Sequence, residues 1–126
     1  MVTKALVVSA LGCAFLAGCA HRGGWDPRAL SETYVKDFTS SDPSCKRSDV
    51  SLSHGEAQAF FKRAKTIDAR TLSDNYPVAP CYLEGTTRYR GESCDWEISA
   101  AQTGSIKCPK TQFLFACDDC KDLFEH

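Results

Sequence analysis

The 126-residue sequence has few histidines, no excess of either charge and no long apolar run. Its three histidines, His21, His54 and His126, are far apart, so none forms the close ligand pair of a zinc site. Fifteen basic residues against 16 acidic ones give a net charge of -1, without the basic excess of a nucleic-acid-binding surface. There is also no glycine-rich phosphate loop and no glycine-flanked serine nucleophile. The sequence therefore predicts no metal, no nucleotide cofactor and no nucleic-acid partner.

The longest apolar run lies at the N-terminus. Lys4 is followed by fourteen residues in which nothing is more polar than Ser9. A membrane-spanning helix needs about 20 apolar residues, whereas a charged start, a short apolar stretch and small residues at its end are typical of a secretory signal. We therefore expect residues 1–18 to be a signal peptide.

The stretch Leu16-Ala17-Gly18-Cys19 resembles the lipobox of bacterial prolipoproteins. In that class the cysteine is lipidated and the peptide before it is removed, so the resemblance implies a covalent lipid such as palmitate on Cys19. Two or three acyl chains hold a protein at a membrane surface. Because Ala20 rather than an aspartate follows the cysteine, the resemblance favours the outer membrane, with the protein facing the periplasm. The alternative is an ordinary cleaved signal with a chance cysteine.

Six cysteines remain once Cys13 is lost with the signal and Cys19 carries lipid. They are Cys45, Cys81, Cys94, Cys108, Cys117 and Cys120. An even number in an oxidising compartment is typical of a small domain stapled by disulfides. We expect residues 19–45 to hold the lipidated cysteine and a tether, and residues 46–126 to form one periplasmic domain.

Two helices are predicted. Asp26-Pro27 is a plausible helix start, after which Leu30, Tyr34 and Phe38 share one face of a possible short helix in the tether. The main helix begins at Ser53, because Ser53-His54-Gly55-Glu56 fits a capping box. Its apolar face is formed by residues spaced three and four apart, namely Ala57, Phe60, Phe61, Ala64 and Ile67.

From Cys81 onward the apolar period changes to two, which indicates strands. Short turns near residues 91–92, 101–104 and 109–110 separate four alternating segments. The predicted fold is α+β, with one main amphipathic helix packed on a four-stranded antiparallel meander. In this register Cys94 and Cys108 flank one hairpin turn and face the core, so they form the best single disulfide pair. Cys45 is expected to join Cys81 or the C-terminal end, and the remaining connectivity stays open because six cysteines allow 15 pairings.

Cys117-Asp118-Asp119-Cys120 could be a redox pair, half of a metal site or a structural staple. A redox cysteine needs an acidified thiol, and two intervening aspartates disfavour the thiolate. No second close cysteine or histidine pair supplies the other half of a zinc site. The staple is therefore favoured.

The outward strand face is the candidate binding surface. It carries Tyr82, Glu84, Arg88, Arg90, Asp95 and Glu97. Cross-strand ion pairs among these residues and Lys107 would be the simplest reason for its charges. We expect a membrane-anchored, non-enzymatic module that binds a periplasmic protein, as an envelope assembly factor or as an inhibitor or immunity protein. The alternative is a periplasmic thiol-disulfide or hydrolytic enzyme that uses Cys117 and Cys120, or His54.

Overall fold

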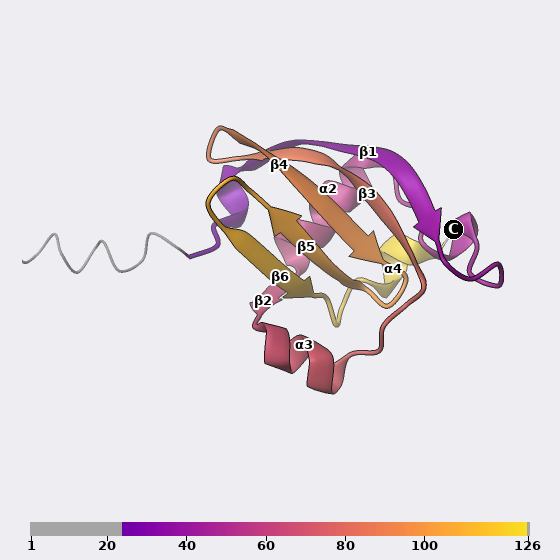
Figure 1. The fold of residues 1–126 in the computed structure, drawn as a ribbon. Coiled ribbons are helices and arrows are strands. Elements are labelled where there is room, and N and C mark those ends of the chain that lie inside the picture. Colours follow the sequence, from indigo (N-terminus) through magenta and orange to yellow (C-terminus); the bar gives the residue numbers. More distant parts are fainter. Residues whose placement is uncertain (1–23, 126) are drawn as a thin grey trace, which may run out of the picture.

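The computed structural model describes residues 24–125, which form one six-stranded antiparallel sheet and three α-helices (Figure 1). The strands lie in the order β1-β3-β4-β5-β6-β2, and their bounds are β1 Leu30–Ser40, β2 Lys65–Ile67, β3 Cys81–Tyr89, β4 Glu92–Ser99, β5 Thr103–Lys107 and β6 Gln112–Ala116. The helices are α2 His54–Arg63, α3 Ala69–Asn75 and α4 Lys121–Phe124, with short 3-10 turns η1 Pro27–Ala29 and η2 Arg47–Asp49. The α+β class is confirmed, but the sheet has six strands rather than four, and three α-helices are present rather than one main helix.

The central strands β3 to β6 form the predicted meander. Along β3 every second residue from Cys81 to Tyr89 is buried, and β4 alternates in the same way through Cys94, Trp96 and Ile98. Side chains of a strand point alternately to its two faces, so one face of the sheet carries the core and the other meets solvent. We call the solvent side, opposite α2, the outer face.

Strand β1 occupies the segment that was expected to hold a short helix. Its pairing with β3 shifts register twice, between Ser31 and Tyr34 and between Val35 and Asp37. Such bulges insert extra residues and break the alternation of a strand. A spacing of four places residues on one face of a regular strand as well as of a helix, so the spacing of Leu30, Tyr34 and Phe38 does not distinguish the two. In the bulged strand Leu30 is buried whereas Tyr34 is exposed. Residues 30–40 belong to the sheet rather than to a tether.

The main helix begins as predicted but ends earlier. The Ser53 hydroxyl accepts a hydrogen bond from the Glu56 amide at 3.1 Å, and the Glu56 carboxylate accepts one from the Ser53 amide at 2.8 Å. The chain then leaves α2 after Arg63 and forms β2, which pairs with β6. β-Branched Thr66 and Ile67 suit a strand. The pairing also gives the outer edge of β6 its backbone hydrogen-bond partners, and a longer α2 would leave that edge unpaired.

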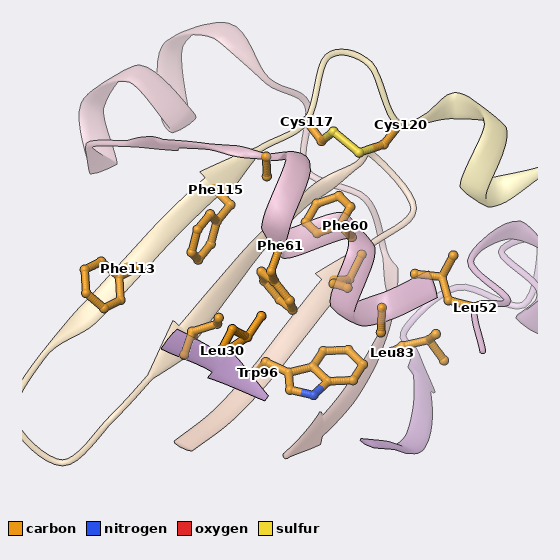
Figure 2. Packing of buried hydrophobic residues seen from close by; sticks show 14 of the residues in the cluster. Leu30, Leu52, Phe60, Phe61, Leu83, Trp96, Phe113, Phe115, Cys117 and Cys120 are labelled. Atoms are coloured by element: carbon orange, nitrogen blue, oxygen red, sulfur yellow. A yellow bond between two sulfur atoms is a disulfide. The ribbon is translucent and has the colours of Figure 1, made fainter. Parts of the chain in front are cut away.

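The core lies between α2 and the sheet (Figure 2). Phe60 and Phe61 are fully buried, and the Phe61 ring lies edge-on to Phe115, with 5.1 Å between centroids. Burying one such side chain contributes about 1.5–3 kcal/mol. Trp96 is buried as well, and its indole N–H donates to the Thr86 carbonyl at 2.9 Å. These aromatic contacts fix α2 on the inner face.

Three disulfides join the six cysteines of this part of the chain. The pairs are Cys45–Cys81, Cys94–Cys108 and Cys117–Cys120. Cys94–Cys108 is the pair favoured from the hairpin register, and Cys81 is one of the two partners expected for Cys45. The expected signal peptide and Cys19 lie outside the described residues. Within residues 24–125 no helix is long and apolar enough to cross a membrane.

Candidate functional site

The outer face brings together five of the six predicted binding residues. Tyr82, Glu84 and Arg88 are half-buried on β3, while Asp95 and Glu97 are exposed on β4. All five alternate with core residues, so their side chains leave the sheet on the side opposite α2.

Arg90 does not belong to this face. It follows the end of β3 and has a positive φ of 52°, so the strand alternation no longer applies to it. Its guanidinium lies over the Tyr89 ring, 5.3 Å from the centroid, and donates to the Gly24 carbonyl at 3.3 Å. Arg90 therefore helps to hold the N-terminal segment at the end of the sheet.

Three carboxylates form a row across neighbouring strands. Asp37 of β1 lies opposite Glu84 of β3, which in turn lies opposite Glu97 of β4. Side chains at directly opposite positions have Cβ atoms about 5 Å apart, and like charges there are destabilising. We call Asp37, Glu84 and Glu97 the acidic row.

The expected cross-strand ion pairs are wrong for this row. Within the described chain no lysine or arginine nitrogen lies within 4.0 Å of a carboxylate of the acidic row or of Asp95. Arg88 instead approaches Glu32 at 3.9 Å, and Lys107 makes no ion pair although it lies opposite Asp95. Glu84 accepts one hydrogen bond, from the Thr39 hydroxyl at 3.2 Å. The negative charge of the row is left for solvent or a ligand.

A groove runs along the acidic row. It has a volume of about 510 Å³ and is lined by the three carboxylates of the row, by Asp95, and by Lys36 and Lys107. Four carboxylates thus face two lysines, and the groove is negative overall.

A second, apolar groove continues from the first. It encloses about 520 Å³ between α3, the loop that follows α3, and the outer face of the sheet. Its apolar lining comprises Ala69, Leu72, Tyr76, Pro77, Val78, Ala79, Tyr82 and Leu114. Val78 is 95% exposed and belongs to the same lining as the other apolar residues of this groove. Glu97, Ser105 and Gln112 line both cavities, so we treat them as one surface, the outer groove.

The two cysteines of the Cys-x-x-Cys segment are buried, and the exposed loop between them is held by hydrogen bonds and ion pairs. Cys117 and Cys120 are 4% and 0% exposed, so their sulfurs are shielded in this conformation (Figure 2). Hydrogen bonds from Lys65 and Tyr76 hold the pKa of Asp118 below its ordinary value of 3.8. Arg63 lowers the pKa of Asp122 in the same way and also donates to the Asp119 carbonyl. These contacts fasten the C-terminal loop to the neighbouring elements.

His54 has a structural contact at the edge of the sheet. Its Nδ1 accepts a hydrogen bond from the Val35 amide at 2.9 Å, and its ring lies edge-on to Tyr34. The imidazole thereby satisfies a donor of β1, at the point where the strand is bulged.

One group in the described part of the chain has the spacing of metal ligands. Cys45, Asp49 and Cys81 place three ligand atoms within 4.8 Å of one another. The two sulfurs are bonded to each other, however, and the Asp49 carboxylate accepts a hydrogen bond from the Lys46 amide at 2.7 Å. A disulfide offers no thiolate to a metal, so this group stabilises the loop before η2.

Sequence reasoning missed about half of the outer groove. Asp37 was assigned to a possible helix, and α3, with Leu72 and the exposed Val78 behind it, was not predicted. Asp68 was the available signal, because its carboxylate caps the Thr71 amide at 2.7 Å as aspartates at helix starts do. Comparison of this chain with protein-family models, curated proteins and solved structures finds no match, so its function has to be inferred from its own residues.

Proposed function

We propose that this protein is a lipid-anchored periplasmic module that binds another protein through its outer groove. The observation that carries the proposal is the acidic row, whose carboxylates make no ion pair in the described chain and which adjoins an apolar groove. Opposed like charges lower stability, and exposed apolar surface is commonly a contact site. A partner with basic and apolar side chains would neutralise the repulsion within the acidic row and cover the apolar groove.

The anchor is proposed from the lipobox-like stretch that ends at Cys19. Labelled palmitate should be incorporated into the wild-type protein and lost in Cys19→Ser, and the variant should leave the membrane fraction. Palmitate incorporation that persists in Cys19→Ser would contradict the assignment of this residue as the anchor.

Two roles fit such a module, an envelope assembly factor and an inhibitor or immunity protein. Both require a stoichiometric protein partner at the same surface, so the first test is whether the outer groove contacts one. A photo-cross-linking amino acid at Gln112, which lines both parts of the groove, should give an adduct of one defined mass in intact cells.

The matched control is the same amino acid at Lys62. This residue is exposed on α2, on the other side of the sheet, and should give no such adduct. Adducts of equal mass and yield from both positions, or none from Gln112, would contradict the proposal.

The buried Cys117–Cys120 bridge favours a staple over a catalytic thiol pair. A redox enzyme exposes its attacking sulfur, whereas here the pair lies under the loop that Lys65 and Arg63 hold in place. Thiol counting on the denatured, non-reduced mature protein should find no free thiol. A thiol pair that is reversibly reduced and oxidised in the native protein would favour the thiol-disulfide enzyme.

A further inference from the structure

The outer groove has a directional order that specifies its ligand further. One outer-face residue from each of five neighbouring strands falls in a single cross-strand line, which reads Asp37, Glu84, Glu97, Ser105 and Leu114 from β1 to β6. The first three are acidic, Ser105 is a small polar residue, and Leu114 lies in the apolar groove below α3. Charge lies at one end of the line and apolar surface at the other.

The length of this line can be estimated from strand geometry. Neighbouring strands lie about 4.8 Å apart, so the acidic row extends over about 10 Å and Leu114 lies about 19 Å from Asp37. A ligand that uses both ends must therefore span about 19 Å and carry its positive charges about 5 Å apart.

A helix meets this spacing better than an extended chain does. On a helix, residues three and four apart lie about 5–6 Å from one another, and the rise is about 1.5 Å per residue. Basic residues at i, i+4 and i+7 would follow the acidic row, and an apolar residue one turn further on the same face, at i+11, would lie about 17 Å from the first and reach toward Leu114. On an extended chain the same face recurs about every 6.7 Å, so a third basic residue would lie beyond Glu97.

We propose that the outer groove receives a basic amphipathic helix of the partner, laid across the strands. Its basic residues lie over the acidic row, and its apolar residue enters the space between α3, Val78 and Leu114. This proposal rests on the function proposed above and names the chemistry of the partner. Helices that place an apolar face in a groove are a common mode of recognition, and charge complementarity sets their orientation.

A metal ion suits the acidic row less well than a basic polypeptide does. In residues 24–125 the three carboxylates of the row do not place ligand oxygens within 4.8 Å of one another, since only Cys45, Asp49 and Cys81 do so. The row is spaced for separate positive charges.

The test uses labelled alanine-based peptides and the full-length lipidated protein in neutral detergent. One peptide has lysines at helical spacing and a leucine one turn beyond them. A second has the same composition with the lysines at alternate positions, and a third has glutamates in place of the lysines. By fluorescence anisotropy at low salt the helical-register peptide should bind at least about tenfold more tightly than either of the others.

Variants of the protein test which residues bind the peptide. The double variant Glu84→Gln/Glu97→Gln should weaken binding about tenfold, since it removes two of the three charges of the acidic row and each exposed charge pair contributes modestly to affinity. Glu92→Gln, an exposed change at the start of β4 outside both cavities, should leave binding unchanged. Val78→Ser should weaken binding and Val78→Leu should preserve it.

Three outcomes would overturn the proposal. Equal binding of the two lysine peptides, or tighter binding of the alternating one, would exclude the helix. Binding that is unchanged in the Glu84 and Glu97 variant would place the peptide elsewhere. If no peptide binds while Gln112 still cross-links to one protein, the proposed basic helix is wrong but the proposed protein-binding function stands. If Gln112 gives no cross-link, the protein-binding function itself is contradicted.

Discussion

Gly85 is the residue on which the central pair of strands depends. It lies directly opposite Trp96, whose indole covers the space where a side chain would be. A Cβ at this position would meet Trp96 ring carbons at 2.6 and 2.8 Å and would overlap the Tyr34 carbonyl oxygen. The absence of a side chain lets β1 and the indole approach the backbone of β3 together.

Gly85→Ala should therefore destabilise the protein by about 1–3 kcal/mol or more, the range for overpacked cores. Urea unfolding followed by tryptophan fluorescence measures this directly. Gly55→Ala is the matched control, because nothing lies within 4 Å of its added Cβ in the first turn of α2. There we expect a gain of up to about 1 kcal/mol. A neutral Gly85→Ala would show that both the indole and the backbone of β1 move aside.

Glu84 contributes negative charge at the expense of stability. It lies between Asp37 and Glu97 in the acidic row. Glu84→Gln should raise the free energy of unfolding by a few tenths to about 1 kcal/mol, because it removes two opposed like-charge pairs. The gain should be larger at low salt, where repulsion is less screened.

The check is urea unfolding of Glu84→Gln at low and at high NaCl. Glu92→Gln serves as the control, because Glu92 lies opposite Tyr89 and not opposite an acid. A loss of stability in Glu84→Gln at low salt would mean that the carboxylate makes a favourable contact after all.

At the scale of elements, the β4–β5 hairpin is held by a disulfide across its open end. Cys94 and Cys108 are separated by 14 residues, and their Cα atoms lie 4.4 Å apart. In the chain-entropy model such a loop is worth about 3 kcal/mol. The double variant Cys94→Ser/Cys108→Ser should lose about this much free energy of unfolding.

The other two bridges give the expected order of effects. Cys117 and Cys120 are only 3 apart in sequence, so their removal should cost about 2 kcal/mol, whereas the 36-residue separation of Cys45 and Cys81 corresponds to about 4 kcal/mol. Thermal unfolding of the three double serine variants would test this ranking. A dominant effect of the Cys117–Cys120 pair would contradict it.

Some helices and strands could be predicted from the local sequence, and others could not. The capping box at Ser53 and the alternation from Cys81 to Cys117 identified α2 and the meander, because both patterns depend on neighbours in the chain. Strand β1 was misassigned because an apolar spacing of four fits a strand as well as a helix, and its two bulges break the alternation that would identify a strand. Strand β2 has three residues, and its partner β6 lies far along the chain. Its β-branched Thr66 and Ile67 favour a strand, but three residues are too few to outweigh the helical spacing that precedes them.

At the scale of the whole molecule, exposed ion pairs join the C-terminal loop to the rest. Lys65 lies 2.8 Å from Asp118, and Arg63 lies 2.8 Å from Asp122. These partners lower the pKa of both aspartates below 3.8. A carboxylate with a lowered pKa in the folded state contributes stability that is complete above its unfolded pKa and is lost as the pH falls through its folded pKa.

Stability should therefore change little through these groups between about pH 7 and pH 4 and should decline below about pH 4. In Asp118→Asn/Asp122→Asn the protein should lose part of this acid sensitivity, as measured by urea midpoints at several pH values. Asp26, Asp42 and Asp68 also have lowered pKa values, so some sensitivity should remain. Identical pH profiles for the two proteins would show that these pairs contribute nothing.

The outer face shows the limit of prediction at this scale. Tyr82, Glu84, Arg88, Asp95 and Glu97 all alternate with buried residues along β3 and β4, as the sequence pattern predicts. Arg90 does not lie on this face, because the chain turns at this residue with a positive φ. The ion pairs expected between these charges did not form, since pairing depends on which strands are neighbours and where each long side chain finds a closer contact.

The sequence by itself determined the features that repeat along the chain: the α+β class, the capped start of α2, the two faces of the meander and the hairpin that brings Cys94 to Cys108. Their physical cause is local, in hydrogen bonds and side-chain directions set within a few residues. Only the tertiary structure decided that Asp37 joins Glu84 and Glu97, and that α3 adds an apolar wall beside them. These contacts join segments far apart in the sequence, and strand pairing across the whole sheet selects them.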